Sequence, residues 1–199
     1  FDIPNPTNTG TWLGEVVVDF GPYQADGTDT VNFEVNPADF DKAAFYDSAT
    51  GVWRFRAGNN WYDPVSYLQW GAAGWIPVVG DWDDDSMDEA GHYDPATKIW
   101  RLKSANTWDA SVTYLVWGPD GGGWTPVAGD WDNDGVDEVG FYDPATGVWR
   151  MRSGNTWSDP VSYLQWGAAG WIPVVGGWDD DGGDEVGHYE PASKIWRLK

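Results

Sequence analysis

The sequence predicts an all-β, β-propeller-like fold made of four tandem repeats, each with four short strands and about 47 residues. Two observations carry this prediction. Trp-Arg pairs recur at Trp53, Trp100, Trp149 and Trp196, which lie 47, 49 and 47 residues apart. Between them, short runs of alternating apolar and polar residues are separated by turns, and the chain holds 26 Gly and 13 Pro.

Other tryptophans keep the same register, so the repeat extends over the whole unit. Three sets recur once per repeat: Trp61, Trp108 and Trp157; Trp70, Trp117 and Trp166; Trp82, Trp131 and Trp178. The third copy is two residues longer, because GPDGGG replaces GAAG between Trp117 and Trp124. An insertion confined to a glycine-rich segment indicates a surface turn. The segment DPVSYLQWGAAGWIPVVG is identical at 63–80 and 159–176, so a pair of repeats is the unit of duplication.

The second repeat illustrates the predicted strands, which cover 76–82, 89–94, 98–103 and 112–118. We expect residues 15–199 to hold the four repeats, at about 15–70, 71–117, 118–166 and 167–199.

The edge of the last repeat is expected to be open, because that repeat stops at its third strand. Residues 1–14 precede the first repeat as an extension with no repeat counterpart. They would either close the ring of their own chain or be donated to a neighbouring molecule, building a fibre by strand exchange. The sequence is compatible with both arrangements.

Charge excludes several classes of partner. The formal net charge is −21, and a field of this sign repels nucleic acid and anionic membranes. No apolar run approaches the 18 or more residues that a membrane span requires. The chain begins at Phe1, which is compatible with a processed secreted form or with a fragment.

Three acidic loops are the candidate functional segments: DWDDDSMDE (81–89), DWDNDGVDE (130–138) and GWDDDGGDE (177–185). Carboxylates at loop positions one, three, five and nine, with a carbonyl at seven and Gly at six, can surround a hard cation. The absence of Cys, and of His within the loops, favours Ca²⁺ over Zn²⁺ or Cu²⁺. An Asp-rich turn is the alternative, and three copies in register disfavour it.

The loops differ in their predicted ligands. The second and third repeats carry full sets: Asp81, Asp83, Asp85 and Glu89, then Asp130, Asp132, Asp134 and Glu138. The second has Ser86 where Gly is expected, which predicts strain if that residue needs a positive φ. The fourth has Gly177 at position one and keeps Asp179, Asp181 and Glu185, so we expect a weaker site. The first repeat is degenerate: Asp19 marks its position one, followed by an insertion.

The stretch DWDNDGVDEVGFYDPATGVW (130–149) resembles the FG-GAP (VCBS-type) repeat of integrin α-subunit propellers and secreted bacterial proteins, and the similarity covers about residues 38–199. The resemblance implies calcium bound by the first, third, fifth and ninth residues and by the seventh carbonyl, from Met87, Val136 and Gly183. The sequence departs from the family in having Glu at position nine directly after an acid, so either neighbour could be the ligand. Family propellers commonly have seven blades, whereas four repeats are present here.

No catalytic motif stands out, and we expect a protein that is not an enzyme. The residues His92 and His188 alternate with Phe45 and Phe141 at one repeat position, which indicates packing. The expected function is a calcium-stabilised extracellular structural or adhesive module. Its expected partner is a further copy of itself or an extracellular glycan or protein.

The alternative is a calcium-dependent carbohydrate-binding propeller, a lectin. Its candidate stacking platforms are Trp75, Trp124 and Trp171, which sit beside glycine-rich turns. A tryptophan that recurs once per repeat is, however, typical of packing between neighbouring blades.

Overall fold

The computed structural model describes residues 43–58, 60, 62–179 and 182–199. The chain divides into Phe1–Asp41, which lies outside the described residues, and one compact unit, Lys42–Lys199. Every regular element described in this unit is a β-strand, which confirms the predicted all-β class. None of the described residues forms a helix with the length and hydrophobicity that a membrane crossing requires.

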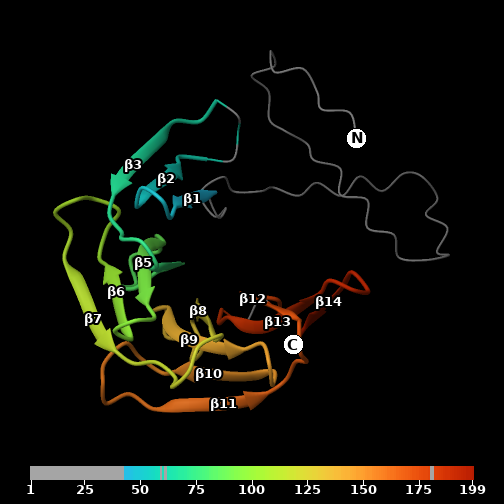
Figure 1. The fold of residues 1–199 in the computed structure, drawn as a ribbon. Coiled ribbons are helices and arrows are strands. Elements are labelled where there is room, and N and C mark those ends of the chain that lie inside the picture. Colours follow the sequence, from blue (N-terminus) through green and yellow to red (C-terminus); the bar gives the residue numbers. More distant parts are fainter. Residues whose placement is uncertain (1–42, 59, 61, 180–181) are drawn as a thin grey trace, which may run out of the picture. The chain divides into compact units, whose positions relative to one another are not determined.

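The strands form four antiparallel sheets, each a meander in chain order (Figure 1). Sheet one contains β1 (Ala44–Asp47), β2 (Val52–Arg56) and β3 (Val65–Gln69). Sheet two contains β4 (Ile76–Gly80), β5 (Glu89–Asp94), β6 (Ile99–Lys103) and β7 (Val112–Val116). Sheet three contains β8 (Thr125–Gly129), β9 (Glu138–Asp143), β10 (Val148–Arg152) and β11 (Val161–Gln165). Sheet four contains β12 (Ile172–Gly176), β13 (Glu185–Glu190) and β14 (Ile195–Leu198).

Four strands per repeat are found in sheets two and three, and the strands of sheet two begin and end within two residues of the predicted ranges. Strand β4 ends at Gly80, two residues early, because the carbonyl of Asp81 accepts a hydrogen bond from Asp137 of the next repeat. Closure into a propeller stays a prediction, as do the limits of the four repeats. The extension 1–14 and the loop acid Asp19 lie outside the described residues.

In sheets one to three, a recurring tryptophan lies buried on an interior strand. Trp100 is opposite Tyr93 on β5 and Leu115 on β7, and its side chain is fully buried. Its indole N–H donates to the carbonyl of Trp117 at 2.9 Å, so the buried polar atom is satisfied. Trp149 makes the same bond to Trp166 at 2.9 Å. The Trp-Arg period therefore marks a buried interior strand in sheets one to three, whereas Trp196 lies on the edge strand β14 and is exposed.

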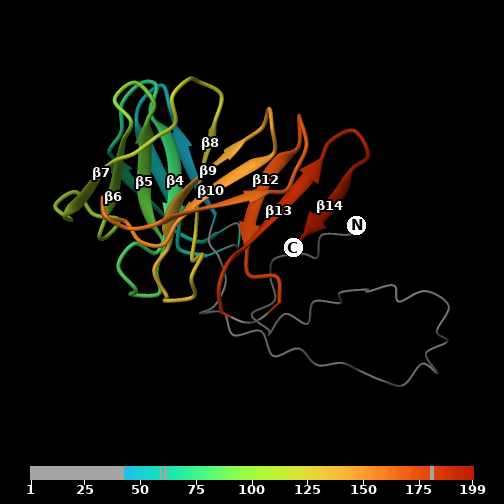
Figure 2. The same cartoon turned by 90° about the horizontal axis from the view of Figure 1, so that it is seen from below.

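Neighbouring sheets meet along their first strands and through rings from their second strands. Strand β8 lies against both β4 and β12. Figure 2 shows sheet three between sheets two and four. Three rings fill the junctions, one per pair of sheets, and all are fully buried: His92, Phe141 and His188. This placement explains why one repeat position alternates only between histidine and phenylalanine.

Candidate metal-binding loops

The acidic loops join the first strand to the second in sheets two, three and four, and the first residue organises the turn in loops 81–89 and 130–138. In loop 81–89, the N–H groups of Asp83 and Asp85 donate to Oδ1 of Asp81 at 3.3 and 3.2 Å. The N–H of Ser86 donates to Oδ2 of Asp81 at 2.7 Å. The backbone therefore curls around the Asp81 carboxylate, which brings the later carboxylates to the same side.

Backbone conformation explains the choice of residues at positions four and six. Asp84 and Asn133 at position four have φ values of 61° and 60°, in the left-handed region that Asp and Asn tolerate best among non-glycine residues. At position six, Gly135 has a φ of 91° and Ser86 has a φ of 66°. The expectation that position six needs a positive φ is confirmed, and Ser86 adopts it at a steric cost that glycine avoids.

Loop 81–89 brings all four of its predicted carboxylates together. Asp81, Asp83, Asp85 and Glu89 each offer an oxygen, and these atoms lie within 4.8 Å of one another. Glu89, the first residue of β5, is 1% exposed, and its buried Oε2 has no hydrogen-bond partner. Burial, and then the three neighbouring aspartates, raises the pKa of Glu89 to about 8. A buried carboxylate with one unpartnered oxygen, facing three other carboxylates, fits a bound cation.

Loop 130–138 brings together three of its four predicted carboxylates: Asp130, Asp132 and Glu138. Asp134 is not in this group, and its carboxylate accepts the N–H of Val136 at 2.9 Å. Glu138 is 1% exposed, and burial followed by the charge of Asp132 raises its pKa to about 8. Its Oε2 accepts the N–H of Trp131 at 3.3 Å. This loop resembles the previous one in its buried glutamate and differs at position five.

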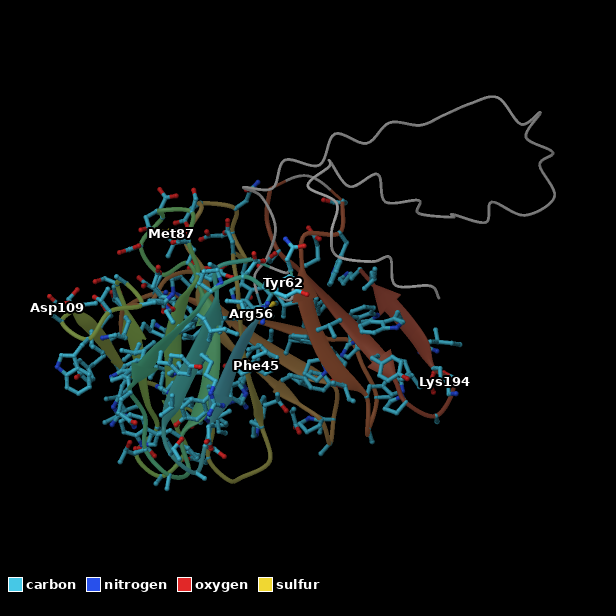
Figure 3. The ribbon with its side chains drawn as sticks, turned by 90° about the horizontal axis from the view of Figure 1, so that it is seen from above. Phe45, Arg56, Tyr62, Met87, Asp109 and Lys194 are labelled. Carbon is cyan, nitrogen blue, oxygen red and sulfur yellow. The ribbon has the colours of Figure 1, made fainter. Side chains whose placement is uncertain are left out.

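In the fourth repeat, Asp181 lies outside the described residues and Asp179 is exposed. Glu185 accepts the N–H of Trp178 at 2.7 Å, which matches the bond between Trp131 and Glu138. Gly177 stands where the other loops have their organising aspartate. A Cβ placed on it would lie 3.2 Å from the carbonyl oxygen of Gly183, the predicted position-seven ligand. The carbonyl contributions of Met87, labelled in Figure 3, and Val136 stay predictions.

The acids at position eight have a role that sequence reasoning missed. The N–H of Asp137 donates to the carbonyl of Asp81 at 2.6 Å, and the N–H of Asp81 donates to Oδ2 of Asp137 at 2.9 Å. Asp184 and Asp130 repeat both bonds at 2.8 and 3.2 Å. Glycine at Gly80 allows the approach, because a Cβ there would lie 2.6 Å from the Asp137 carboxylate. Since position eight binds the preceding loop, position nine is the better candidate ligand.

Two asparagines, also unpredicted, hold the ends of the loops. The Nδ2 of Asn106 donates to the carbonyl of Asp88 at 2.8 Å, and its Oδ1 accepts the N–H of Ala90 at 2.9 Å. Asn155 makes the equivalent bonds to Asp137 and Val139 at 2.7 and 3.2 Å. Each asparagine thus fixes the residues on either side of a buried glutamate. Their shared Asn-Thr-Trp motif, 49 residues apart, is the signal that would have found them.

The three candidate sugar platforms belong to the junctions between sheets. A guanidinium group lies over each indole: Arg101 over Trp75 at 3.9 Å, Arg150 over Trp124 at 4.1 Å and Arg197 over Trp171 at 4.2 Å. Each indole also contacts one junction ring, at centroid distances of 5.5, 6.4 and 5.5 Å. One face of each indole is therefore already engaged within the protein.

A cavity of about 270 Å³ lies beside one of these indoles, at the long turn of the third copy. Its lining combines an aromatic wall with polar groups and a glycine run: Tyr93, Pro95, Lys98, Pro119, Gly121, Gly122, Gly123 and Trp124. The Nζ of Lys98 lies 2.5 Å from a carboxylate oxygen of Asp120.

Comparison with known proteins found no matching family model, no matching curated protein and no matching solved structure. The resemblance to the FG-GAP repeat therefore stays a prediction that rests on the sequence motif.

Proposed function

We propose that this protein is a calcium-stabilised repeat module with a structural or adhesive role outside the cell. The observation that carries the proposal is Glu89, a buried carboxylate with an unpartnered oxygen that faces Asp81, Asp83 and Asp85. Without a cation, this group would either hold a proton near neutral pH or suffer strong repulsion. A divalent cation removes both penalties.

The donor set favours calcium among divalent cations. Every candidate ligand is an oxygen, from carboxylates and one backbone carbonyl, and such hard ligands suit Ca²⁺ or Mg²⁺. Mg²⁺ demands a strict octahedron and keeps several waters, whereas Ca²⁺ accepts six to eight oxygens in a flexible shell. The crowding of four carboxylates in loop 81–89 therefore suits Ca²⁺ better.

The position of the loops links calcium to the stability of the stacked repeats. Loop 130–138 contains Asp137, which holds the backbone of Asp81, and loop 177–185 contains Asp184, which holds Asp130. A cation that orders one loop would also order its contact with the preceding repeat. Sites of modest affinity, as in extracellular calcium modules, fill only where calcium is at millimolar levels. We therefore place the protein outside the cell.

The proposal is tested by thermal unfolding in calcium and in EDTA. A ligand present at about 100 times its dissociation constant adds roughly 2.7 kcal/mol per site, so calcium should raise the melting temperature by several degrees. Glu89→Gln should reduce this gain, whereas Asp109→Asn, an exposed change outside the loops, should preserve it. Identical melting curves in calcium and EDTA, with no metal detected by elemental analysis, would contradict the proposal.

A second candidate function, carbohydrate binding, is favoured by the cavity beside Trp124. The lining combines the aromatic residues Trp124 and Tyr93 with Lys98, which pairs with Asp120, and aromatic surface beside polar groups is what sugar binding requires. If a sugar binds there, oligosaccharides should change tryptophan fluorescence, and Trp124→Ala should abolish the response. Tyr67→Ala, at an exposed side chain on β3 of sheet one, is the matched control. A broad glycan array without a hit would remove this candidate.

A further inference from the structure

Each junction between sheets consists of a ring from one sheet inserted among aromatic residues of the preceding sheet and of the segment that links the two sheets. His92, on β5, contacts four side chains, with ring centroids 4.6–5.5 Å away: Tyr46, Trp53, Trp70 and Trp75. We call the inserted ring the plug and the aromatic group around it the cage.

The other two junctions repeat this arrangement. The plug Phe141 lies 4.9–6.4 Å from its cage, which consists of Tyr93, Trp100, Trp117 and Trp124. The plug His188 lies 4.6–5.5 Å from Tyr142, Trp149, Trp166 and Trp171. All three plugs are 0% exposed. The junction is therefore a recurring interface whose partners are already defined within this chain.

A fourth plug is present and uncovered. Phe45 on β1 is opposite Arg54 on β2, as His92 is opposite Arg101 and Phe141 is opposite Arg150. Phe45 is nevertheless 61% exposed, and Figure 3 labels it on its strand. The same position is fully buried in three other repeats, so Phe45 presents an apolar surface that none of the described residues covers.

Half of a fourth cage is also present and uncovered, in sheet four. The rings of Tyr189 and Trp196 are 4.9 Å apart and tilted by 40°, close to the 4.9 Å and 41° of Tyr93 and Trp100. Trp196 is 60% exposed, whereas Trp100 and its counterparts in sheets one and three are at most 2% exposed. Its neighbours Ile195 and Leu198 are 47% and 51% exposed. The half-cage is therefore formed in advance and remains open.

We propose that a second copy of this chain docks head to tail, with Phe45 of one copy entering the Tyr189–Trp196 half-cage of the next. The geometry points to this occupant because the chain contains three examples of the same plug in the same cage. The contact joins two different surfaces, so each copy keeps one free plug and one free half-cage, and association can continue. This inference goes beyond calcium binding and rests on different residues.

Variants at the two halves of the interface provide the first test, by sedimentation velocity in calcium at about 150 mM salt, where the repulsion between acidic copies is screened. The wild-type chain should associate as its concentration rises. Phe45→Asp and Trp196→Asp should each abolish association, and both side chains are exposed enough for folding to persist. Tyr114→Asp, at a 65% exposed side chain on β7 of sheet two, is the matched control and should associate as the wild type does.

Mixing the two variants provides the second, sharper test. The Phe45→Asp chain keeps its half-cage and the Trp196→Asp chain keeps its plug, so an equimolar mixture should form one-to-one dimers that cannot grow. A wild-type chain that stays monomeric at every concentration would overturn the proposal. So would a mixture that forms no dimer. Association that persists in both single variants would also overturn it, and would indicate strand pairing along the edge of β14.

Discussion

The carboxylate of Asp137 holds the backbone of Asp81, which belongs to the preceding repeat. The N–H of Asp137 donates to the Asp81 carbonyl at 2.6 Å, and the N–H of Asp81 donates to Oδ2 of Asp137 at 2.9 Å. These two bonds imitate the exchange between paired residues of an antiparallel ladder, with a side chain replacing one carbonyl. Burial raises the pKa of Asp137 to about 7, because a charged carboxylate is costly in this environment.

This contact predicts a difference between two substitutions. Asp137→Asn keeps an oxygen that accepts the Asp81 N–H, whereas Asp137→Ala leaves that buried donor without a partner. We expect the alanine variant to lose about 1–3 kcal/mol of unfolding free energy and the asparagine variant to lose much less. Urea unfolding in EDTA measures both. Equal losses would show that the side-chain hydrogen bond does not stabilise the junction.

The raised pKa of Asp137 also sets a pH dependence. The folded protein retains a proton that the unfolded chain has already lost above about pH 4, so this contribution to stability is complete at low pH. It declines as the pH rises from about 4 and is fully lost once the pH exceeds about 7. In EDTA, Asp137→Asn should therefore weaken the decline in stability between about pH 4 and 7. An unchanged slope in urea unfolding across that range would contradict this assignment.

The histidines at the junctions between sheets predict the opposite pH dependence, with stability that falls as the pH drops. His92 and His188 are fully buried, and both nitrogens of each ring have no hydrogen-bond partner among the described residues. Burial, and then the charges of Arg101 and Arg197, lowers the pKa of each histidine to about 4. Stability should be complete above about pH 6.5, where the unfolded histidines are neutral, and should fall as the pH drops towards 4.

Exchanging the plug residues tests this directly, because the third repeat uses phenylalanine at the same position. The variant with both His92→Phe and His188→Phe should lose the acid sensitivity of the junctions. It should also gain about 1 kcal/mol or more per site at pH 7, since unsatisfied buried nitrogens are removed. The matched control is Phe141→His, which should introduce the sensitivity at the second junction. If the stability of the wild type and of the double variant changes in parallel from pH 7 to pH 4.5, the two histidines are not the source of the acid sensitivity.

Local sequence patterns were sufficient for the strands and for the position of the loops. Alternation around Trp100, and turn residues after each run, determine where β4–β7 lie, because these signals act within one repeat. The convergence of Asp81 and Glu89 was likewise expected from one loop. In contrast, the contact between Asp137 and Asp81 joins residues 56 positions apart, and it depends on how the sheets stack.

Position five of the loops is a second feature that the sequence could not predict. Asp85 and Asp134 occupy equivalent loop positions, and the carboxylate of each accepts the N–H of the residue two positions later. Only Asp85, however, belongs to the cluster of converging carboxylates in its loop. Residue type does not distinguish them, because the difference lies in loop conformation. The stacking of Arg101 on Trp75 was also hidden, because it joins a residue that precedes β4 to a residue on β6 and depends on how the repeat folds.

The loops should also differ in calcium affinity. Asp132 belongs to a group of three converging carboxylates, whereas Asp179 belongs to a loop that has Gly177 at its first position. We therefore expect Asp132→Ala to reduce total calcium binding free energy more than Asp179→Ala does, as measured by titration calorimetry. Equal losses would show that the fourth loop is as strong a site as the third.

The fourth loop can be strengthened if its first residue is the missing ligand. Among the described residues, a Cβ on Gly177 meets only the carbonyl oxygen of Gly183, at 3.2 Å, so a side chain fits with a small adjustment. Gly177→Asp supplies the carboxylate that organises the other two loops through Asp81 and Asp130. We expect calcium affinity at this loop to rise about tenfold or more, since hydrogen bonds and contacts to a charged group contribute about 1.5–3 kcal/mol. Gly177→Asn has the same shape without the charge and should give a much smaller gain. If the two variants bind calcium equally in titration calorimetry, position one does not act as a carboxylate ligand.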